Sequence, residues 1–176
     1  MKTINDWFDD YGESHQNKTN KIIHWICIPL IFWSIIALLS VIPSNYLNFT
    51  DSNFLNNCSH WGTIVICLGL LFYLRLSIPI FLGMLFFSIF IILDIYFFQY
   101  FFEKHKFWGL LSSVNLSSKT FLLYLSVLIF IFSWILQFVG HKIEGKKPSF
   151  FKDIQFLLIG PAWLLGFILT KLKIKY

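Results

Sequence analysis

Five apolar runs dominate the 176-residue sequence and restrict it to a membrane fold. An α-helix needs about 20 apolar residues to cross the ~30 Å hydrocarbon core of a bilayer. Hydrophobic residues make up 57% of the chain and charged residues 13%, which is too apolar for a soluble globule of this size. We therefore expect an all-α, polytopic membrane helix bundle with four or five transmembrane helices, formed by residues 1–176 as a single integral membrane domain. The predicted spans lie near residues 22–41, 61–74, 78–102, 120–140 and 154–170.

Two of these spans leave alternatives open. Arg75 and Pro79 interrupt the second and third runs, so the pair is predicted to form two helices joined by a tight turn. One long kinked helix is the alternative. The last run is broken by Gly160-Pro161, and it either crosses the membrane or forms a re-entrant segment. Pro29 lies inside the first run and is expected to kink that helix.

Residues 1–21 are polar and are predicted to form an amphipathic N-terminal segment. Trp7, Phe8 and Tyr11 have helical spacing and suit the membrane interface. The segment has no apolar stretch typical of a cleavable signal peptide, so we expect the first span to act as the targeting signal.

The distribution of lysines predicts the orientation in the membrane. The loop at 42–60 contains no Lys or Arg, whereas the loop at 141–152 contains four lysines. By the positive-inside rule, the N-terminus and the 141–152 loop face the cytoplasm. The host membrane is then a bacterial inner membrane or the endoplasmic reticulum. The net charge of +5 follows from these loop lysines and forms no basic stripe among aromatics, so we expect no nucleic-acid binding.

Two polar clusters, each next to an apolar run, carry the candidate chemistry. In the first, Asn20 and His24 share a helix face at spacing i,i+4, and Asn17 lies three positions before Asn20. His15 lies nine positions before His24, so the two would point in opposite directions on one continuous helix. Convergence of the two histidines therefore requires a break near residues 14–17.

The second cluster consists of Gln137, His141 and Glu144 at spacing i, i+4, i+7. These residues form one polar stripe at the end of an apolar helix, and Gly145 and Pro148 follow as helix terminators. Four predicted spans lie between the two clusters. Because that number is even, both clusters are expected on the same side of the membrane.

Three histidines of these clusters form a candidate metal site. Neutral imidazoles bind Fe, Zn, Cu and Ni, and a carboxylate can complete the ligand set. His15, His24 and His141, with Glu144 nearby, have this composition. The alternative is that these are interfacial histidines that hydrogen-bond to lipid headgroups and backbone, since neither an HxxxH nor an HExxH motif is present.

Two motifs then occur in order, each at a predicted membrane edge. The first reads Tyr11-x3-His15-x-Asn17-x2-Asn20-x3-His24-x4-Pro29, and the second reads Gln137-Phe-Val-Gly-His141-x2-Glu144-x3-Pro148. With them, the chain from about Trp7 to Gly166 resembles the membrane family typified by the fungal endoplasmic-reticulum 2-hydroxy fatty acid dioxygenase, which has many bacterial members.

The resemblance implies an iron(II)-dependent dioxygenase of fatty acid α-oxidation. Such an enzyme shortens a 2-hydroxy fatty acid by one carbon, using molecular oxygen. The histidines that match the family's motifs are His15, His24 and His141, which the resemblance implies as Fe²⁺ ligands. Glu144 is implied either as a further ligand or as a residue that supports the ligands.

The resemblance also implies roles for the remaining polar residues. Glu144 and Asn20 are expected to support catalysis, and Asn17, Gln137 and Lys142 are expected to contact the substrate. A 2-hydroxy acid can chelate iron through its carboxylate and hydroxyl, which leaves a position for oxygen. The acyl tail would then stay between the apolar helices or in lipid.

Other polar residues keep different functions open. His60 and His105 lie in predicted loops on the opposite face and are expected to be solvated. Asp94 lies deep in the third apolar run, where a carboxylate is usually paired or functional. A proton relay through Asp94 would suit a non-enzymatic membrane protein, such as a small transporter or a scaffold, although no inverted repeat of broken helices accompanies it. A different metal chemistry, such as a zinc lipid hydrolase, is the third possibility.

Overall fold

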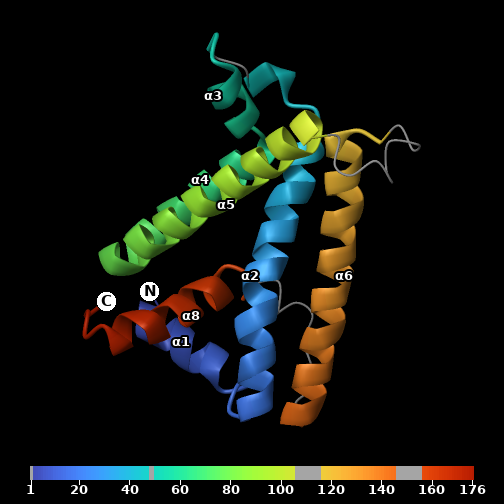
Figure 1. Ribbon diagram of the computed structural model, residues 1–176. Coiled ribbons are helices and arrows are strands. Elements are labelled where there is room, and N and C mark those ends of the chain that lie inside the picture. The colour runs from blue at the N-terminus through green and yellow to red at the C-terminus, as the bar shows by residue number, and fades with distance from the viewer. Residues whose placement is uncertain (1, 48–49, 106–115, 146–155) are drawn as a thin grey trace.

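The long apolar runs form long helices. The computed structural model describes residues 2–47, 50–105, 116–145 and 156–176, and within them the chain forms helices and no strands. Three of these helices are long and apolar enough to cross a membrane, which indicates a helical membrane protein: α2 (Lys18–Val41), α5 (Ile78–His105) and α6 (Ser118–Glu144) (Figure 1). Pro29 lies within α2, and the helix continues through it.

Two further apolar helices are shorter than a membrane span. Helix α4 (Trp61–Leu76) has 16 residues and α8 (Ile159–Lys171) has 13. At 1.5 Å per residue they are about 24 Å and 20 Å long, against ~30 Å of hydrocarbon. The predicted total of four or five spans is therefore not confirmed, and the predicted boundary at residue 154 lies outside the described residues.

The second and third runs form two separate helices, as predicted. Helix α4 ends at Leu76, and Ser77 has an extended backbone with φ −164° and ψ 127°. Helix α5 begins at the next residue, with Pro79 in its first turn, where a missing N–H costs nothing. The alternative of one long kinked helix is wrong.

The predicted break before the first span is also present. Helix α1 (Ile4–Gly12) ends before His15, and Asn17 is the N-cap of α2. The Asn17 side-chain oxygen accepts hydrogen bonds from the backbone N–H groups of Thr19 and Asn20, which satisfies donors that have no partner within the helix. Because the helix is interrupted here, His15 and His24 are not forced to point in opposite directions.

Helix α1 is amphipathic, and its apolar face is covered by protein. Ile4, Phe8 and Tyr11 are buried and pack in a cluster with Trp163 of α8. The predicted lipid-interface position is therefore wrong for Phe8 and Tyr11, because α8 supplies the apolar surface that they bury.

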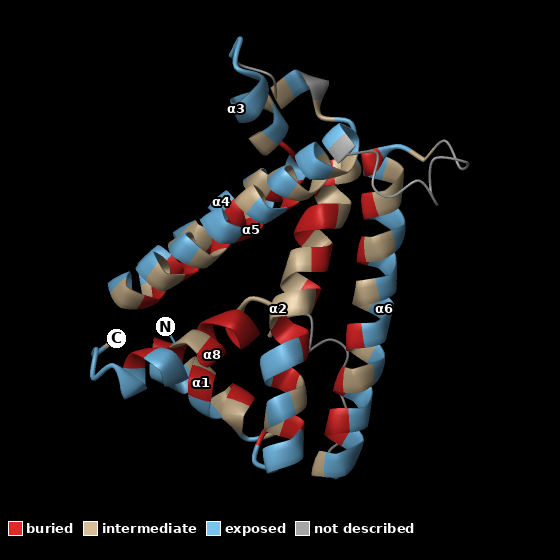
Figure 2. Ribbon diagram, in the orientation of Figure 1, coloured by how far each residue is buried: buried red, intermediate tan, exposed pale blue. Residues whose placement is uncertain are grey.

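Helices α2 and α6 run side by side and share the most extensive contact between elements (Figure 1). The hairpin of α4 and α5 slants away from them. Buried residues lie mainly on facing sides of the helices, whereas the outward faces are exposed (Figure 2). Those outward faces carry large apolar side chains such as Phe86 and Leu128, as expected for surfaces in contact with lipid.

Asp94 has a hydrogen-bond partner, whereas His60 is buried beside Gly62. The Asp94 carboxylate accepts a hydrogen bond of 2.7 Å from the Trp33 indole N–H, which ties α5 to α2. His60 is only 3% exposed at the start of α4, so the prediction that it is solvated is wrong. Its ring covers Gly62, where any larger side chain would collide with it. The prediction for the His105 side chain lies outside the described residues.

The polar loop predicted at 42–60 contains short helices. They are a 3₁₀ helix, η1 (Asn45–Leu47), and helix α3 (Asn53–Cys58). At the other end of the molecule, α6 stops at Gly145, as predicted. Gly145 adopts the left-handed conformation with φ 75°, which glycine adopts without strain. The second predicted terminator, Pro148, lies outside the described residues.

Gly140 sets the distance between α2 and α6 and provides a test of this packing. A Cβ at position 140 would lie 2.3 Å from the side-chain oxygen of Asn20. Gly140→Ala should therefore destabilise the protein by about 1–3 kcal/mol, as overpacking does in other cores. Thermal unfolding in detergent measures the loss. Val139→Ala, at an exposed neighbouring position, is the control; equal melting temperatures for the two variants would contradict the close helix contact.

Candidate metal centre

The structure brings the three predicted histidines together. His15 lies in the segment between α1 and α2, His24 lies on α2, and His141 lies in the last turn of α6. Their exposed fractions are 2%, 0% and 6%. One ring nitrogen of each lies within 4.8 Å of those of the other two, so one ion could contact all three. Both clusters therefore lie at the same end of the molecule, as predicted.

Backbone carbonyls fix the proton on two of the rings. Nδ1 of His15 lies 2.6 Å from the Tyr11 carbonyl oxygen, and Nδ1 of His24 lies 2.9 Å from that of Asn20. A carbonyl only accepts hydrogen bonds, so each Nδ1 carries the proton and each Nε2 keeps its lone pair. Both Nε2 atoms are buried, with no hydrogen-bond partner among the described residues. A buried lone pair without a donor is costly, and a metal ion satisfies it.

The surroundings of His15 keep its imidazole neutral. Burial lowers the pKa of His15 to about 4, and the neighbouring His141 also lowers it. The Tyr11 ring stacks on His15 with centroids 4.2 Å apart and an angle of 13° between the planes. Because a metal ligand must be neutral imidazole, His15 is available to a metal at neutral pH without losing a proton.

The Glu144 carboxylate joins the two clusters. One of its oxygens accepts a hydrogen bond of 2.8 Å from the Gln16 backbone N–H. The other accepts bonds of 2.9 Å from the Asn17 backbone N–H and 3.0 Å from the Asn20 side-chain amide. Both oxygens are thus used to hold the His15 segment against the end of α6. We infer that Glu144 positions the ligands rather than binding the metal itself.

Asn20 connects this arrangement to His24. Its side chain is fully buried, and its amide donates to the Ser14 carbonyl at 3.1 Å as well as to Glu144. Its own backbone carbonyl accepts the proton of His24 Nδ1. Asn20 therefore links His24 to the segment before α2 and to Glu144, which favours an orienting role.

The three residues expected to contact substrate lie in different surroundings. Gln137 is buried and lines the cavity beside the histidines, one turn before His141 on α6. Lys142 is exposed next to His141. Asn17 is also exposed, and its side chain caps α2. Of the three, Gln137 alone lines this cavity.

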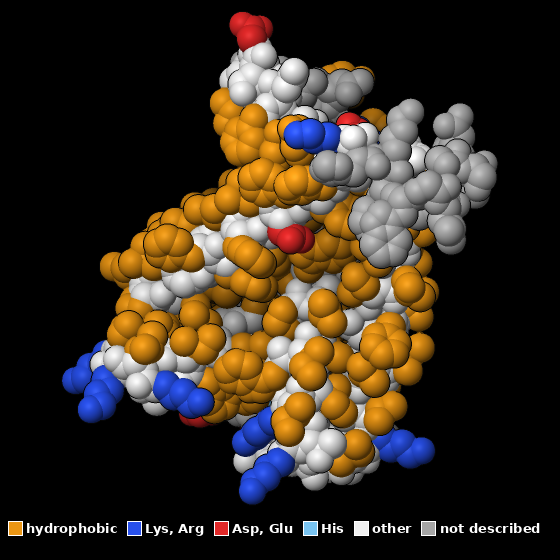
Figure 3. Space-filling model, in the orientation of Figure 1, with side chains coloured by type: hydrophobic (Ala, Val, Ile, Leu, Met, Phe, Trp, Pro, Cys, Tyr) orange, Lys and Arg blue, Asp and Glu red, His pale blue; other side chains and the backbone are white. Residues whose placement is uncertain are grey.

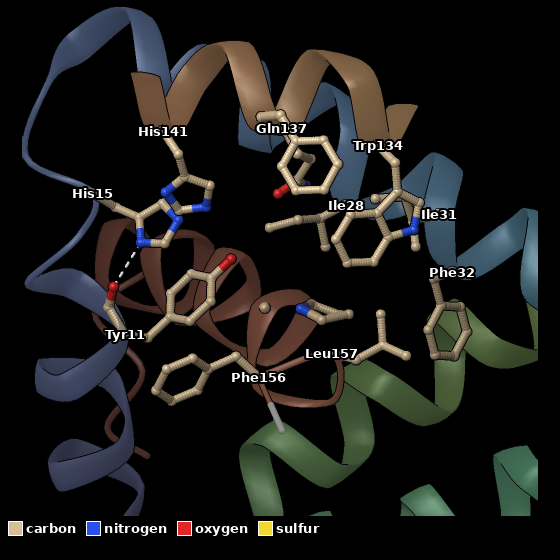
Figure 4. A pocket seen from close by; sticks show the side chains of 13 residues that line it. Tyr11, His15, Ile28, Ile31, Phe32, Trp134, Gln137, His141, Phe156 and Leu157 are labelled. Atoms are coloured by element: carbon tan, nitrogen blue, oxygen red, sulfur yellow. Dashed lines mark hydrogen bonds between the residues drawn. The ribbon is translucent and has the colours of Figure 1, made fainter. Parts of the chain in front are cut away.

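A narrow cavity of about 40 Å³ adjoins the histidines. The rings of His15 and His141 lie at one end of it, and those of Trp134 and Phe32 lie at the other (Figure 4). Since one water needs roughly 10–15 Å³ measured in this way, the cavity accepts a few water-sized molecules but no fatty acyl chain.

Tyr11 is one of several cavity residues to which the sequence alone assigns no role in the site. It lines the cavity as well as stacking on His15. Its position four residues before His15, at the start of the first motif, was the available signal. Aromatic spacing alone had placed it at the membrane interface, because helix α8 was not known to cover that face.

Lysines gather at the end of the molecule where the site lies (Figure 3). These lysines include Lys18 and Lys21 at the start of α2, Lys142 at the end of α6 and Lys171 at the end of α8. The middle of the molecule carries mainly apolar side chains on the face shown. The candidate metal centre therefore lies toward a basic end of an otherwise apolar molecule.

Comparison with known proteins identifies one family. A family model described as 2-hydroxy-palmitic acid dioxygenase Mpo1-like matches residues 1–172, nearly the whole chain. Searches of curated proteins and of solved structures find no match.

The metal content of histidine variants tests the centre. The purified protein should hold one ion per chain, because the described residues contain one such histidine group. His15→Ala, His24→Ala and His141→Ala should each lose most of that metal, measured by elemental mass spectrometry. His60→Ala removes a buried histidine far along the chain and should retain the metal. Full metal in His24→Ala, or equal loss in His60→Ala, would count against the site.

Glu144→Gln separates a positioning role from a ligand role. The amide keeps one acceptor oxygen and loses the charge that holds the Gln16 and Asn17 N–H groups. Metal affinity, measured by competition with a chelator, should fall about 10–100-fold, as for other residues that support metal ligands. The visible spectrum of the cobalt(II) form should stay unchanged because the ligands are the same, whereas an altered spectrum would make Glu144 a ligand. Glu13→Gln is the matched control and should change neither quantity.

Proposed function

Because the chain belongs to the Mpo1-like family of 2-hydroxy-palmitic acid dioxygenases, we propose that it is a membrane-bound, iron(II)-dependent dioxygenase that shortens a 2-hydroxy fatty acid by one carbon. The observation that carries the proposal is the buried group of three histidines with two unsatisfied Nε2 atoms. An active centre of this kind needs a metal that accepts imidazole ligands and retains open positions.

The donor set fits iron(II). His15, His24 and His141 would hold the ion, and Glu144 and Asn20 would keep the ligands in place through their hydrogen bonds. Bound iron would supply open positions for the carboxylate and hydroxyl of the substrate and for oxygen. The overall reaction balances with one O₂ per 2-hydroxy acid, which yields the shorter acid, CO₂ and water. It needs no external reductant.

The other residues of the centre support this use. Gln137 lines the cavity and would hydrogen-bond the substrate head, and Lys142, exposed next to His141 in the sequence, would attract a carboxylate. The cavity walls of Trp134, Phe32 and Ile28 limit the access of water to the reacting groups. The basic end that carries the centre corresponds to the cytoplasmic side under the positive-inside rule.

The surroundings of Asp94 give less support to a transporter. Its carboxylate accepts a hydrogen bond from Trp33, which accounts for a carboxylate in an apolar helix without a proton pathway. A zinc lipid hydrolase would use the same histidines, so the metal and the consumption of oxygen distinguish it from the proposed enzyme.

Oxygen uptake tests the proposed function. Addition of 2-hydroxypalmitic acid to the iron-loaded protein in detergent should consume one O₂ per acid, measured with an oxygen electrode, and release the acid shortened by one carbon. Palmitic acid lacks the hydroxyl and should give no uptake. His24→Ala should abolish the reaction. Turnover of an ester by the zinc-loaded protein, with no oxygen uptake by the iron-loaded protein, would contradict the proposal.

A further inference from the structure

A second hollow, larger than the histidine cavity, lies along one face of α8. Its volume is about 250 Å³, and it is enclosed by α2, α5 and α8. We call it the acyl groove. Its walls are made by side chains that are apolar apart from one indole nitrogen: Trp25, Pro29, Gly83, Met84, Phe87, Pro161, Leu164, Leu165 and Ile168.

The acyl groove adjoins the histidine cavity through shared walls. Pro161 lines both spaces. On α2, Ile28 lines the histidine cavity while the next residue, Pro29, lines the acyl groove. The α8 residues that line the groove have the helical spacing i, i+3, i+4 and i+7, and they are Pro161, Leu164, Leu165 and Ile168. One face of α8 therefore borders the groove over about 10 Å.

The two spaces match the two parts of a 2-hydroxy fatty acid. The histidine cavity offers imidazoles and Gln137 to a polar head, but its 40 Å³ excludes the tail. The acyl groove has six times that volume and no charged side chain in its lining. Trp25 and Ile168 at its edge are exposed on an apolar surface, so a chain dissolved in the bilayer can enter without crossing water.

We propose that the acyl groove binds the hydrocarbon tail of the substrate while the head reaches the histidines past Pro161. This inference rests on the proposed function for the identity of the head group. Met84 is 2% exposed and lies deep in the groove, which makes it the residue that limits chain length. A resident membrane lipid is the competing occupant, and the experiment below distinguishes it.

Photo-crosslinking locates the tail without requiring turnover. The full-length, metal-loaded protein in lipid nanodiscs is irradiated with 2-hydroxypalmitic acid that carries a diazirine at its chain end, and labelled residues are found by mass spectrometry. Label should concentrate on groove residues of α5 and α8, such as Met84 and Leu165, and excess unlabelled 2-hydroxypalmitic acid should remove it. Two results would overturn the proposal that the groove binds the substrate tail. One is label spread over exposed positions such as Leu128 and Ile131 of α6, and the other is label that added phospholipid removes equally well.

Two variants test the same site through chain-length preference. Ile168→Trp fills the groove from its exposed edge and should lower kcat/KM for 2-hydroxypalmitic acid about tenfold relative to 2-hydroxyoctanoic acid, because fewer methylenes are buried. Met84→Ala enlarges the groove from inside and should shift the preference toward longer acids. Ile135→Trp adds the same ring at an exposed position of α6 and should leave the preference unchanged.

The outcomes separate the two proposals. Oxygen uptake with unchanged chain-length preference in both groove variants, and no label in the groove, overturns the acyl groove and leaves the dioxygenase intact. A different result is groove labelling that unlabelled 2-hydroxypalmitic acid removes, without oxygen uptake from any acid. That result supports the groove as a hydroxy-acid binding site and contradicts the proposed dioxygenase activity.

Discussion

The candidate site depends on one carboxylate. Glu144 bonds to backbone and side-chain donors that lie 124 to 128 positions earlier in the sequence. These hydrogen bonds hold the His15 segment against the end of α6. They are needed here because His15 lies between two helices, where no helical hydrogen bonds fix it. Without the carboxylate, His24 and His141 would still be held on packed helices, whereas His15 would keep its contacts to Tyr11 but lose the link between its segment and α6.

The helix α8 connects the membrane fold to the chemistry. It is shorter than the three long apolar helices, and it packs against α1, α2 and α5. On one side Trp163 packs against Tyr11, which stacks on His15. On the other side its apolar residues line the acyl groove. The same helix thus desolvates the imidazoles, which keeps His15 neutral, and lines both the small histidine cavity and the larger apolar groove.

Much of the local structure could be predicted from spacing. The distance from His15 to His24 required a break in the helix, and the structure has it at residues 13–17. The i, i+4, i+7 stripe that ends in Glu144 could be read from the sequence, and both clusters lie at one end as predicted, although the number of spans behind that prediction is not confirmed. Tertiary contacts could not be predicted in this way. Phe8 is buried by segments distant in sequence, and an apolar run alone does not reveal whether lipid or protein covers it, as in α4 and α8. The role of Glu144 depends on donors that only the folded chain brings near it.

X-ray absorption at the iron edge of the iron(II)-loaded protein tests the central claim most directly. The expected first coordination shell contains three imidazole nitrogens, with the remaining positions taken by oxygen from water or substrate. A shell with one imidazole or none, or one with sulfur ligands, would contradict a centre built from His15, His24 and His141.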